Sequence, residues 1–230
     1  MLKKLIEIYK RIHFNILNKS LEEKSKNITL FRQNQALKET VEFINSNMEY
    51  APAFQNKFQL ISHAIAELSS YKGLIIEFGV FQGKTINYIA KLLPNHQIFG
   101  FASFEGLPEP WNTLKKGAFK VKRIPKVRSN IILKKGWFNE TIPVFKKTIS
   151  GNISLLHIDC DLYSSAKLIF EELGNNIDKD TIVIFDEFFN FPSWKNGEYK
   201  AFMEFVQKQH KNFEYIGYCF RGEQVAVKIL

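Results

Sequence analysis

The stretch from Gly73 to Thr85 constrains the fold more than any other part of the chain. It reads GLIIEFGVFQGKT, an apolar run that ends in an acid and passes into a loop with two glycines. Such a run predicts a buried parallel strand, after which Thr85 opens a helix. A strand, a glycine-containing loop and a helix in this order are typical of α/β domains that bind a small ligand.

The same alternation continues to the end of the chain. We expect further strands at residues 97–101, 130–133, 153–158, 181–185, 214–219 and 224–229, with helices that include 85–93, 164–173 and 200–210. Alternating strands and helices imply right-handed crossovers and a parallel sheet. The sequence therefore predicts an α/β, Rossmann-like fold over residues 71–230: a mostly parallel seven-stranded sheet with helices on both faces. The last two strands are predicted to form an antiparallel pair.

Residues 1–70 are predicted to form an N-terminal helical extension that serves as a substrate lid or a dimer contact. Helices are expected at 36–47 and 58–68, with a break at 27–35 and a turn at 51–53. Leu2, Leu5, Ile8 and Ile12 recur at helical spacing with basic residues between them. This pattern suits a packing face, such as that of a homodimer, better than contact with a membrane surface.

Composition narrows the class of protein. The 230 residues suit one α/β domain with an extension, and 45% hydrophobic residues argue against disorder. The net charge is +9, but the lysines are spread along the chain, and we expect no nucleic-acid partner. No apolar run reaches membrane-spanning length. Cys160 and Cys219 lack metal-binding spacing, which indicates reduced thiols in a cytoplasmic protein.

The loop after the first strand favours a cationic ligand group over a phosphate. Gly79 would let a ligand approach the backbone, and Gly83 would allow close packing where the helix begins. A dinucleotide motif needs a third glycine, and a P-loop would need glycine at the position of Phe78. Glu77 at the strand end either holds a positive group, such as an ammonium, or caps the loop.

Four acids follow two later strands. Asp159 and Asp161 come after the strand at 153–158, and Asp186 and Glu187 come after the strand at 181–185. If these strands are neighbours, the acids share one cleft and repel each other without a cation. Oxygen ligands of this kind suit Mg²⁺. The alternative is that each pair caps a following helix.

Five segments in order resemble one enzyme family. Residues 77–85 resemble the first motif of class I S-adenosylmethionine-dependent methyltransferases, and more narrowly that of the macrocin O-methyltransferase family, which modifies sugars of antibiotics and related glycosides. FASFEGLPE at 101–109, GWF at 136–138 with TIP at 141–143, HIDCDLY at 157–163 and FDE at 185–187 are similar to its later motifs. The resemblance covers about residues 60–205. It implies cofactor contacts from Glu77, Gly79, Phe81, Gly83, Thr85, Ser103, Phe104, Glu105, Gly136, Trp137, Phe138 and Asp159.

The resemblance also implies roles for the acids. Asp159, Asp186 and Glu187 fall on the metal-binding positions, although Glu187 replaces the usual Asp or Asn. Asp161 falls on the position of the general base, and with Asp159 it forms the expected catalytic pair. One departure concerns the cofactor ribose: the family has an acid where this chain has Ala102, so Ser103 or Glu105 would have to substitute.

Together these features predict an S-adenosylmethionine-dependent, Mg²⁺-dependent O-methyltransferase that acts on a hydroxyl of a sugar or glycoside. A bound metal lowers the pKa of such a hydroxyl, and a carboxylate can then take its proton. A phenolic acceptor is the first alternative. Catechol methyltransferases, however, carry a lysine at the position of Leu162. A non-catalytic S-adenosylmethionine-binding protein is the second, since Ala102 removes one expected cofactor contact.

Overall fold

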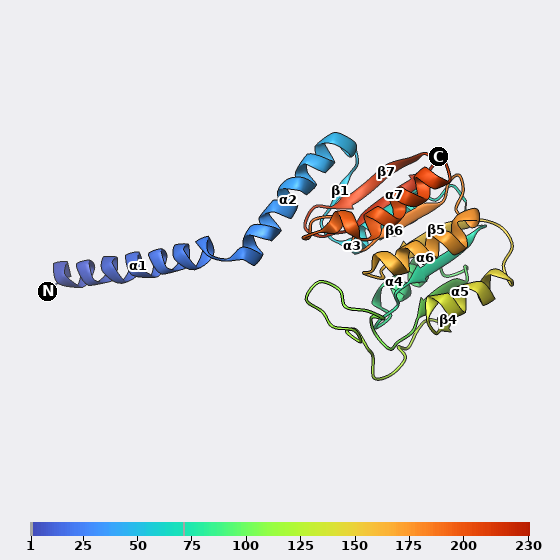
Figure 1. Ribbon diagram of the computed structural model, residues 1–230, viewed down its shortest axis with the longest axis horizontal. Helices are drawn as coiled ribbons and strands as arrows, with labels where there is room; N and C mark the ends of the chain where they lie inside the picture. Colours follow the sequence, from blue (N-terminus) through green and yellow to red (C-terminus); the bar gives the residue numbers. More distant parts are fainter. Residues whose placement is uncertain (1, 71) are drawn as a thin grey trace.

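The computed structural model describes residues 2–70 and 72–230, without the side chains of 2–5 and 20–24. One sheet organises the body, with the strand order β1-β7-β8-β6-β5-β2-β3-β4 (Figure 1). Among the strands of the described residues, only β8 runs antiparallel to its neighbours. The Rossmann-like fold class is thereby confirmed, together with the antiparallel final pair. The strands are β1 (Ala53–Phe54), β2 (Leu74–Phe78), β3 (Ile98–Ala102), β4 (Ile131–Lys135), β5 (Ile153–Ile158), β6 (Ile182–Phe185), β7 (Phe213–Cys219) and β8 (Val225–Ile229).

Helices cover both faces of the sheet, as predicted (Figure 1). α3 (Lys57–Ala66) and α4 (Lys84–Leu92) bury Leu60 and Ile86 in one apolar core. On the other face, α5 (Phe138–Lys146), α6 (Tyr163–Leu173) and α7 (Glu198–Lys208) contribute to a second, phenylalanine-rich core. The two cores bury the central strands β2, β5 and β6 between apolar layers, and so fix the positions of their ends.

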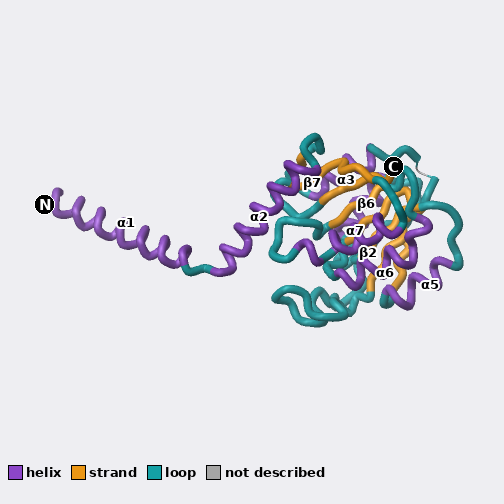
Figure 2. Tube along the Cα trace, turned by 45° about the horizontal axis from the view of Figure 1, so that its top comes forward, coloured by secondary structure: helices purple, strands orange, loops and turns teal. Residues whose placement is uncertain are grey.

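The N-terminal residues form an arm of two helices, α1 (Leu2–Ser25) and α2 (Ile28–Asn47), and α1 projects away from the sheet (Figures 1 and 2). The expected break at 27–35 is wrong beyond its first residue. Asn27 accepts a hydrogen bond from the Leu30 backbone N–H at 3.0 Å, and this cap starts α2 at once. In the predicted apolar stripe Ile8 and Ile12 are exposed, while the side chains of Leu2 and Leu5 lie outside the described residues.

Two elements of the predicted extension pack on the sheet. β1 pairs with β7, so the expected turn at 51–53 ends in an eighth, two-residue strand. α3 buries Leu60 and Ile61 against the sheet. The division of the chain near residue 70 stays a prediction, and residues 1 and 71 lie outside the described part. Among the described helices, none is both long enough and apolar enough to span a bilayer.

The strand order places the carboxyl ends of four strands together. β2 lies between β5 and β3. From β2 the chain adds β3 and β4 on one side, and it then crosses back to add β5 and β6 on the other side. The loops that follow β2 and β5 therefore diverge to opposite faces and leave a crevice, where ligands bind in such sheets.

Candidate functional site

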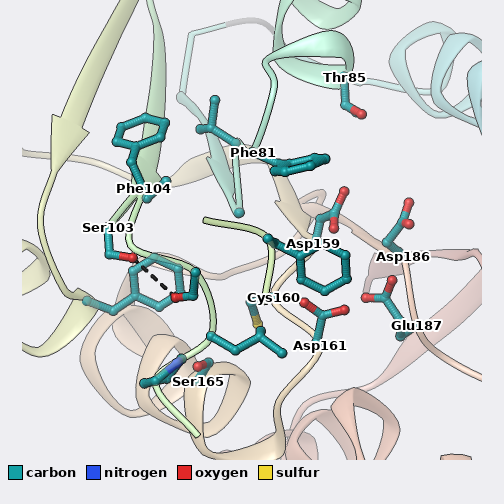
Figure 3. Close-up of a pocket in the computed structure, with 18 of the residues that line it drawn as sticks. Phe81, Thr85, Ser103, Phe104, Asp159, Cys160, Asp161, Ser165, Asp186 and Glu187 are labelled. Atoms are coloured by element: carbon teal, nitrogen blue, oxygen red, sulfur yellow. Dashed lines mark hydrogen bonds between the residues drawn. The ribbon is translucent and has the colours of Figure 1, made fainter. Parts of the chain in front are cut away.

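A pocket of about 870 Å³ opens at the carboxyl ends of β2, β3, β5 and β6 (Figure 3). It contains most of the residues predicted from the sequence, and it contains both the proposed cofactor loops and the acids. The predicted residues that line it are Gly79, Phe81, Thr85, Ser103, Phe104, Trp137, Phe138, Asp159, Asp161, Asp186 and Glu187. Glu77, Gly83, Glu105 and Gly136 are not part of the lining.

Gly79 brings the loop that follows β2 against the end of β5. Its φ is +100°, and a Cβ at this position would lie 1.5 Å from the Asp159 carbonyl oxygen. The Gly79 N–H also donates to the Phe101 carbonyl at 2.9 Å, and the Asp159 N–H donates to the Phe78 carbonyl at 2.8 Å. Glycine is therefore required for the approach of two protein segments, in addition to any ligand.

In the loop that follows β3, the two residues that could replace the missing ribose-binding acid, Ser103 and Glu105, lie in different surroundings. Ala102 and Ser103 line the pocket, and the Ser103 hydroxyl accepts a hydrogen bond from the Glu105 N–H at 3.1 Å. The Glu105 carboxylate is exposed and pairs with Lys120 outside the pocket lining. Of the two candidates, only Ser103 is placed to meet a ligand.

Four non-glycine residues in the pocket lining have left-handed backbones. Phe81, Phe104, Phe119 and Asp161 have φ values of +42°, +62°, +65° and +63°. Side chains with a Cβ rarely adopt this region, and such strain concentrates at functional sites. The left-handed backbone directs these side chains differently from an extended backbone.

The 106–128 segment and the start of α3 complete the pocket. From the segment, Leu107, Pro108 and Phe119 line it, and Phe119 packs edge-on against Phe81 with ring centroids 5.6 Å apart. From α3, Lys57 and Phe58 line it.

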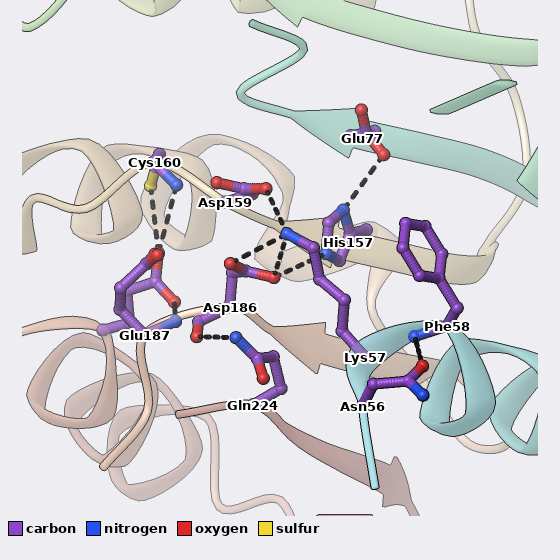
Figure 4. A network of polar contacts seen from close by, with 11 residues as sticks. Asn56, Lys57, Phe58, Glu77, His157, Asp159, Cys160, Asp186, Glu187 and Gln224 are labelled. Carbon is purple, nitrogen blue, oxygen red and sulfur yellow. Dashed lines mark hydrogen bonds and ion pairs between the residues drawn. The ribbon is translucent and has the colours of Figure 1, made fainter. Parts of the chain in front are cut away.

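Lys57 lies among the acids, although no pattern in the sequence indicated it (Figure 4). Its Nζ donates to Asp186 Oδ1 at 3.0 Å and Oδ2 at 3.1 Å, and lies 3.7 Å from Asp159 Oδ2. These carboxylates raise the pKa of Lys57 despite its burial, so the ammonium stays charged. Asn56 accepts hydrogen bonds from the Phe58 and Gln59 N–H groups, which fixes the first turn of α3 and the position of Lys57.

Glu77 reaches the acids only through His157 (Figure 4). Both side chains are fully buried, and His157 Nδ1 lies 3.1 Å from Glu77 Oε2. His157 Nε2 lies 3.9 Å from Asp186 Oδ1. Burial disfavours the imidazolium, but Asp186 and Glu77 outweigh it and raise the pKa of His157 to about 10. The direct contact expected from Glu77 to a cofactor ammonium stays a prediction, because the carboxylate faces His157.

The aspartates titrate differently although they share one cleft. Burial, reinforced by the negative charge of Asp186, raises the pKa of Asp159 to about 8 and that of Asp161 to about 6. Burial would also raise the pKa of Asp186, but His157 and Lys57 outweigh it and lower the value to about 2. Asp186 is thus the permanently ionised member, while Asp161 can exchange a proton near neutral pH.

Glu198 joins the two acid-bearing loops and was also missed. It is fully buried at the start of α7, and its carboxylate accepts hydrogen bonds from the Cys160 N–H at 3.2 Å and the Glu187 N–H at 3.3 Å. It thereby fixes the spacing between the segments that follow β5 and β6. Burial, reinforced by the negative charge of Glu198, raises the pKa of Glu187 well above its usual value.

The residues present do not fit the predicted magnesium ion as they are arranged. His157, Asp159 and Asp186 form a candidate metal site, with donor atoms within 4.8 Å of one another, but Glu187 is not in this group. Mg²⁺ prefers oxygen ligands in octahedral array, whereas this set includes a nitrogen. The Lys57 ammonium already contacts both Asp186 oxygens, and a second cation there would be repelled.

Comparison with known proteins agrees with this geometry. Residues 76–188 match the family model described as a methyltransferase domain. The calicheamicin methyltransferase CalS11 shares the fold at 21% identity, with 88% of this chain and 93% of that chain covered and a TM-score of 0.61. A second CalS11 structure, described as a TDP-rhamnose 3'-O-methyltransferase, shares it at 21% identity, with 74% and 77% covered and a TM-score of 0.54. The O-methyltransferase NovP does so at 18% identity, with 74% and 76% covered and a TM-score of 0.54. No curated protein matches the sequence.

Proposed function

We propose that this chain, a class I S-adenosylmethionine-dependent methyltransferase, transfers the methyl group to a hydroxyl of a sugar or glycoside. One observation carries the proposal: the loops that follow β2 and β3 and the acids that follow β5 and β6 line a single pocket. A cofactor bound by the loops that follow β2 and β3 would present its methyl group toward the acids. The sugar substrate of CalS11 supports the choice of acceptor, since that enzyme shares the fold.

The pocket suits S-adenosylmethionine on its own chemistry. Trp137 and Phe138 offer flat apolar surfaces for an adenine, and Ser103 offers a hydroxyl for a ribose. The acidic surroundings favour the cationic sulfonium and ammonium groups. When bound, the cofactor supplies a methyl group on a good leaving group, so the protein needs to position the acceptor and remove its proton.

Asp161 is the residue that we propose removes this proton. It lines the pocket, its backbone is held in a left-handed conformation, and its pKa of about 6 leaves it ionised at neutral pH. A base with a pKa just below the working pH is both deprotonated and a useful proton acceptor. Asp186, with its lowered pKa, is too weak a base for this step.

A phenolic acceptor is the second candidate, because Phe81 and Phe119 form an aromatic pair at the pocket. The lysine expected of catechol methyltransferases is absent at Leu162, although Lys57 reaches Asp159 from another element. Asp186 holds the Lys57 ammonium in its charged form, so this lysine cannot serve as a base.

Replacing Ala102 by aspartate is expected to tighten the binding of S-adenosylhomocysteine about tenfold, the value of one added hydrogen bond to a charged group. Ala102 ends β3 and lines the pocket, where an acid can bind both ribose hydroxyls. Isothermal titration calorimetry measures the change. Ala102→Asn, which matches the size without the charge, should give a smaller gain. Unchanged or weaker binding by Ala102→Asp would place the ribose elsewhere.

A methyl-transfer screen tests the proposed function. The purified chain is incubated with S-adenosylmethionine carrying a labelled methyl group and with nucleotide sugars, glycosides, glycans or catechols. We expect label in a sugar or glycoside, with the methylated oxygen located by NMR. Turnover of catechols alone would establish the phenolic alternative. Cofactor binding without transfer to any acceptor class would favour a non-catalytic role.

A further inference from the structure

Lys57 occupies the place that a divalent ion would need. Its Nζ contacts both oxygens of Asp186 and lies 3.7 Å from Asp159, so it sits between two of the three predicted metal ligands (Figure 4). A metal ion bound by the same carboxylates would have to displace it, because two cations at one site repel each other.

The chain's own cations also meet the need that suggested a metal. Asp159, Asp161 and Asp186 converge in one cleft, and acids so placed require a positive charge nearby. Lys57 supplies one from α3, and His157 Nε2 lies 3.9 Å from the same Asp186 oxygen that Lys57 contacts. The cluster is therefore compensated from within the protein.

The geometry leaves Lys57 free to act on a ligand. An ammonium has three N–H donors, and its two hydrogen bonds to Asp186 use at most two of them. The side chain is 30% exposed and lines the pocket. The Asn56 cap and the buried residues Leu60 and Ile61 hold α3 in place, so the ammonium is positioned before any ligand arrives.

We propose that Lys57 replaces the metal ion in this methyltransferase and is the fixed positive charge that binds the acceptor hydroxyl oxygen. The inference rests on the proposed function. The oxygen attacks the methyl carbon as the carbon–sulfur bond breaks, and its proton passes to Asp161. Lys57 keeps its own proton and stabilises the negative charge that develops on the oxygen. The products are the methyl ether, S-adenosylhomocysteine and protonated Asp161.

Metal titration tests the inference without any acceptor, and so separately from the proposed function. Mn²⁺ and Mg²⁺ are titrated by calorimetry into the wild type and into Lys57→Met, each checked for folding by circular dichroism. The wild type should show no saturable binding below about 1 mM, the range of weak cation sites. Removing the ammonium should tighten Mn²⁺ binding at least about tenfold, because a neighbouring positive charge is lost.

Two further variants complete this test. Lys57→Arg keeps the charge and should bind Mn²⁺ as poorly as the wild type. Lys84→Met removes another lysine of the pocket lining, at the start of α4, that is not paired with these acids, and it should leave metal binding unchanged. Unchanged or weaker Mn²⁺ binding by Lys57→Met overturns the inference, as does micromolar binding by the wild type.

Kinetics provide the second readout once an acceptor is known. Wild-type methyl transfer should be unaffected by a chelator, and Lys57→Met should be slower by about 10² or more, the cost of losing one transition-state donor. A wild-type enzyme that stops in the presence of chelator and recovers with Mg²⁺ contradicts the inference. In that case the proposed methyl transfer still stands, because the chelator result concerns only the source of the positive charge.

Discussion

Replacing Asp161 by asparagine is expected to lower kcat by about 10²- to 10⁴-fold, the usual contribution of a general base. The amide has nearly the same shape but cannot accept the acceptor's proton. Asparagine also tolerates the left-handed backbone at this position, where φ is +63°. The binding of S-adenosylhomocysteine should therefore persist, and a kcat loss with retained cofactor binding would locate the defect in the proton transfer.

The matched control for this variant is Asp180→Asn. Asp180 also has a left-handed backbone, with φ at +70°, but it lies outside the pocket lining and pairs with Lys228. Its replacement should leave kcat near the wild-type value. Full activity of Asp161→Asn in steady-state methyl transfer would remove Asp161 from the mechanism and leave Asp159 as the remaining candidate base.

Replacing Gly79 by alanine is expected to destabilise the fold by at least about 3 kcal/mol and to abolish cofactor binding. The new Cβ would lie 1.5 Å from the Asp159 carbonyl oxygen, and this backbone atom cannot move without shifting the end of β5. The loop that follows β2 would have to move away from the sheet, and Phe81 would move with it. Chemical denaturation and calorimetry with S-adenosylhomocysteine measure the two effects.

Gly151→Ala separates steric overlap from backbone strain. Gly151 has a φ of +97°, close to the +100° of Gly79, but a Cβ there would meet nothing within 4 Å. We expect it to cost about 1–2 kcal/mol, the penalty of a left-handed alanine, with cofactor binding intact. Equal losses of stability in the two alanine variants would contradict the tight approach of the loop that follows β2 to β5.

The central strands could be predicted because each is a short apolar run buried on both faces, as in β2 and β5. The start of α2 was missed because residues 28–35 are rich in polar side chains and project from the body, where periodicity carries little information. β1 has only two residues, and it exists because β7 offers a free edge. A strand this short leaves no local sequence pattern that could predict it.

The acids of the site could be predicted because they follow parallel strands, whose carboxyl ends must meet. Their partners could not. Lys57 is separated from Asp186 by 129 positions, and only the packing of α3 brings the two together. Glu198 looked like an ordinary acid in the first turn of a helix, yet it is fully buried. Glu77 was given a ligand role because a strand-end acid attracts cations, and His157 supplies that cation from the next strand.

Calorimetric titration of the wild-type chain with S-adenosylhomocysteine tests the central claim most directly. The claim is that the pocket at the ends of β2, β3, β5 and β6 is a cofactor site beside a set of catalytic acids. We expect saturable binding of one molecule per chain, lost in Gly79→Ala and retained in Asp161→Asn. The absence of binding to the folded wild type at millimolar ligand would contradict the claim.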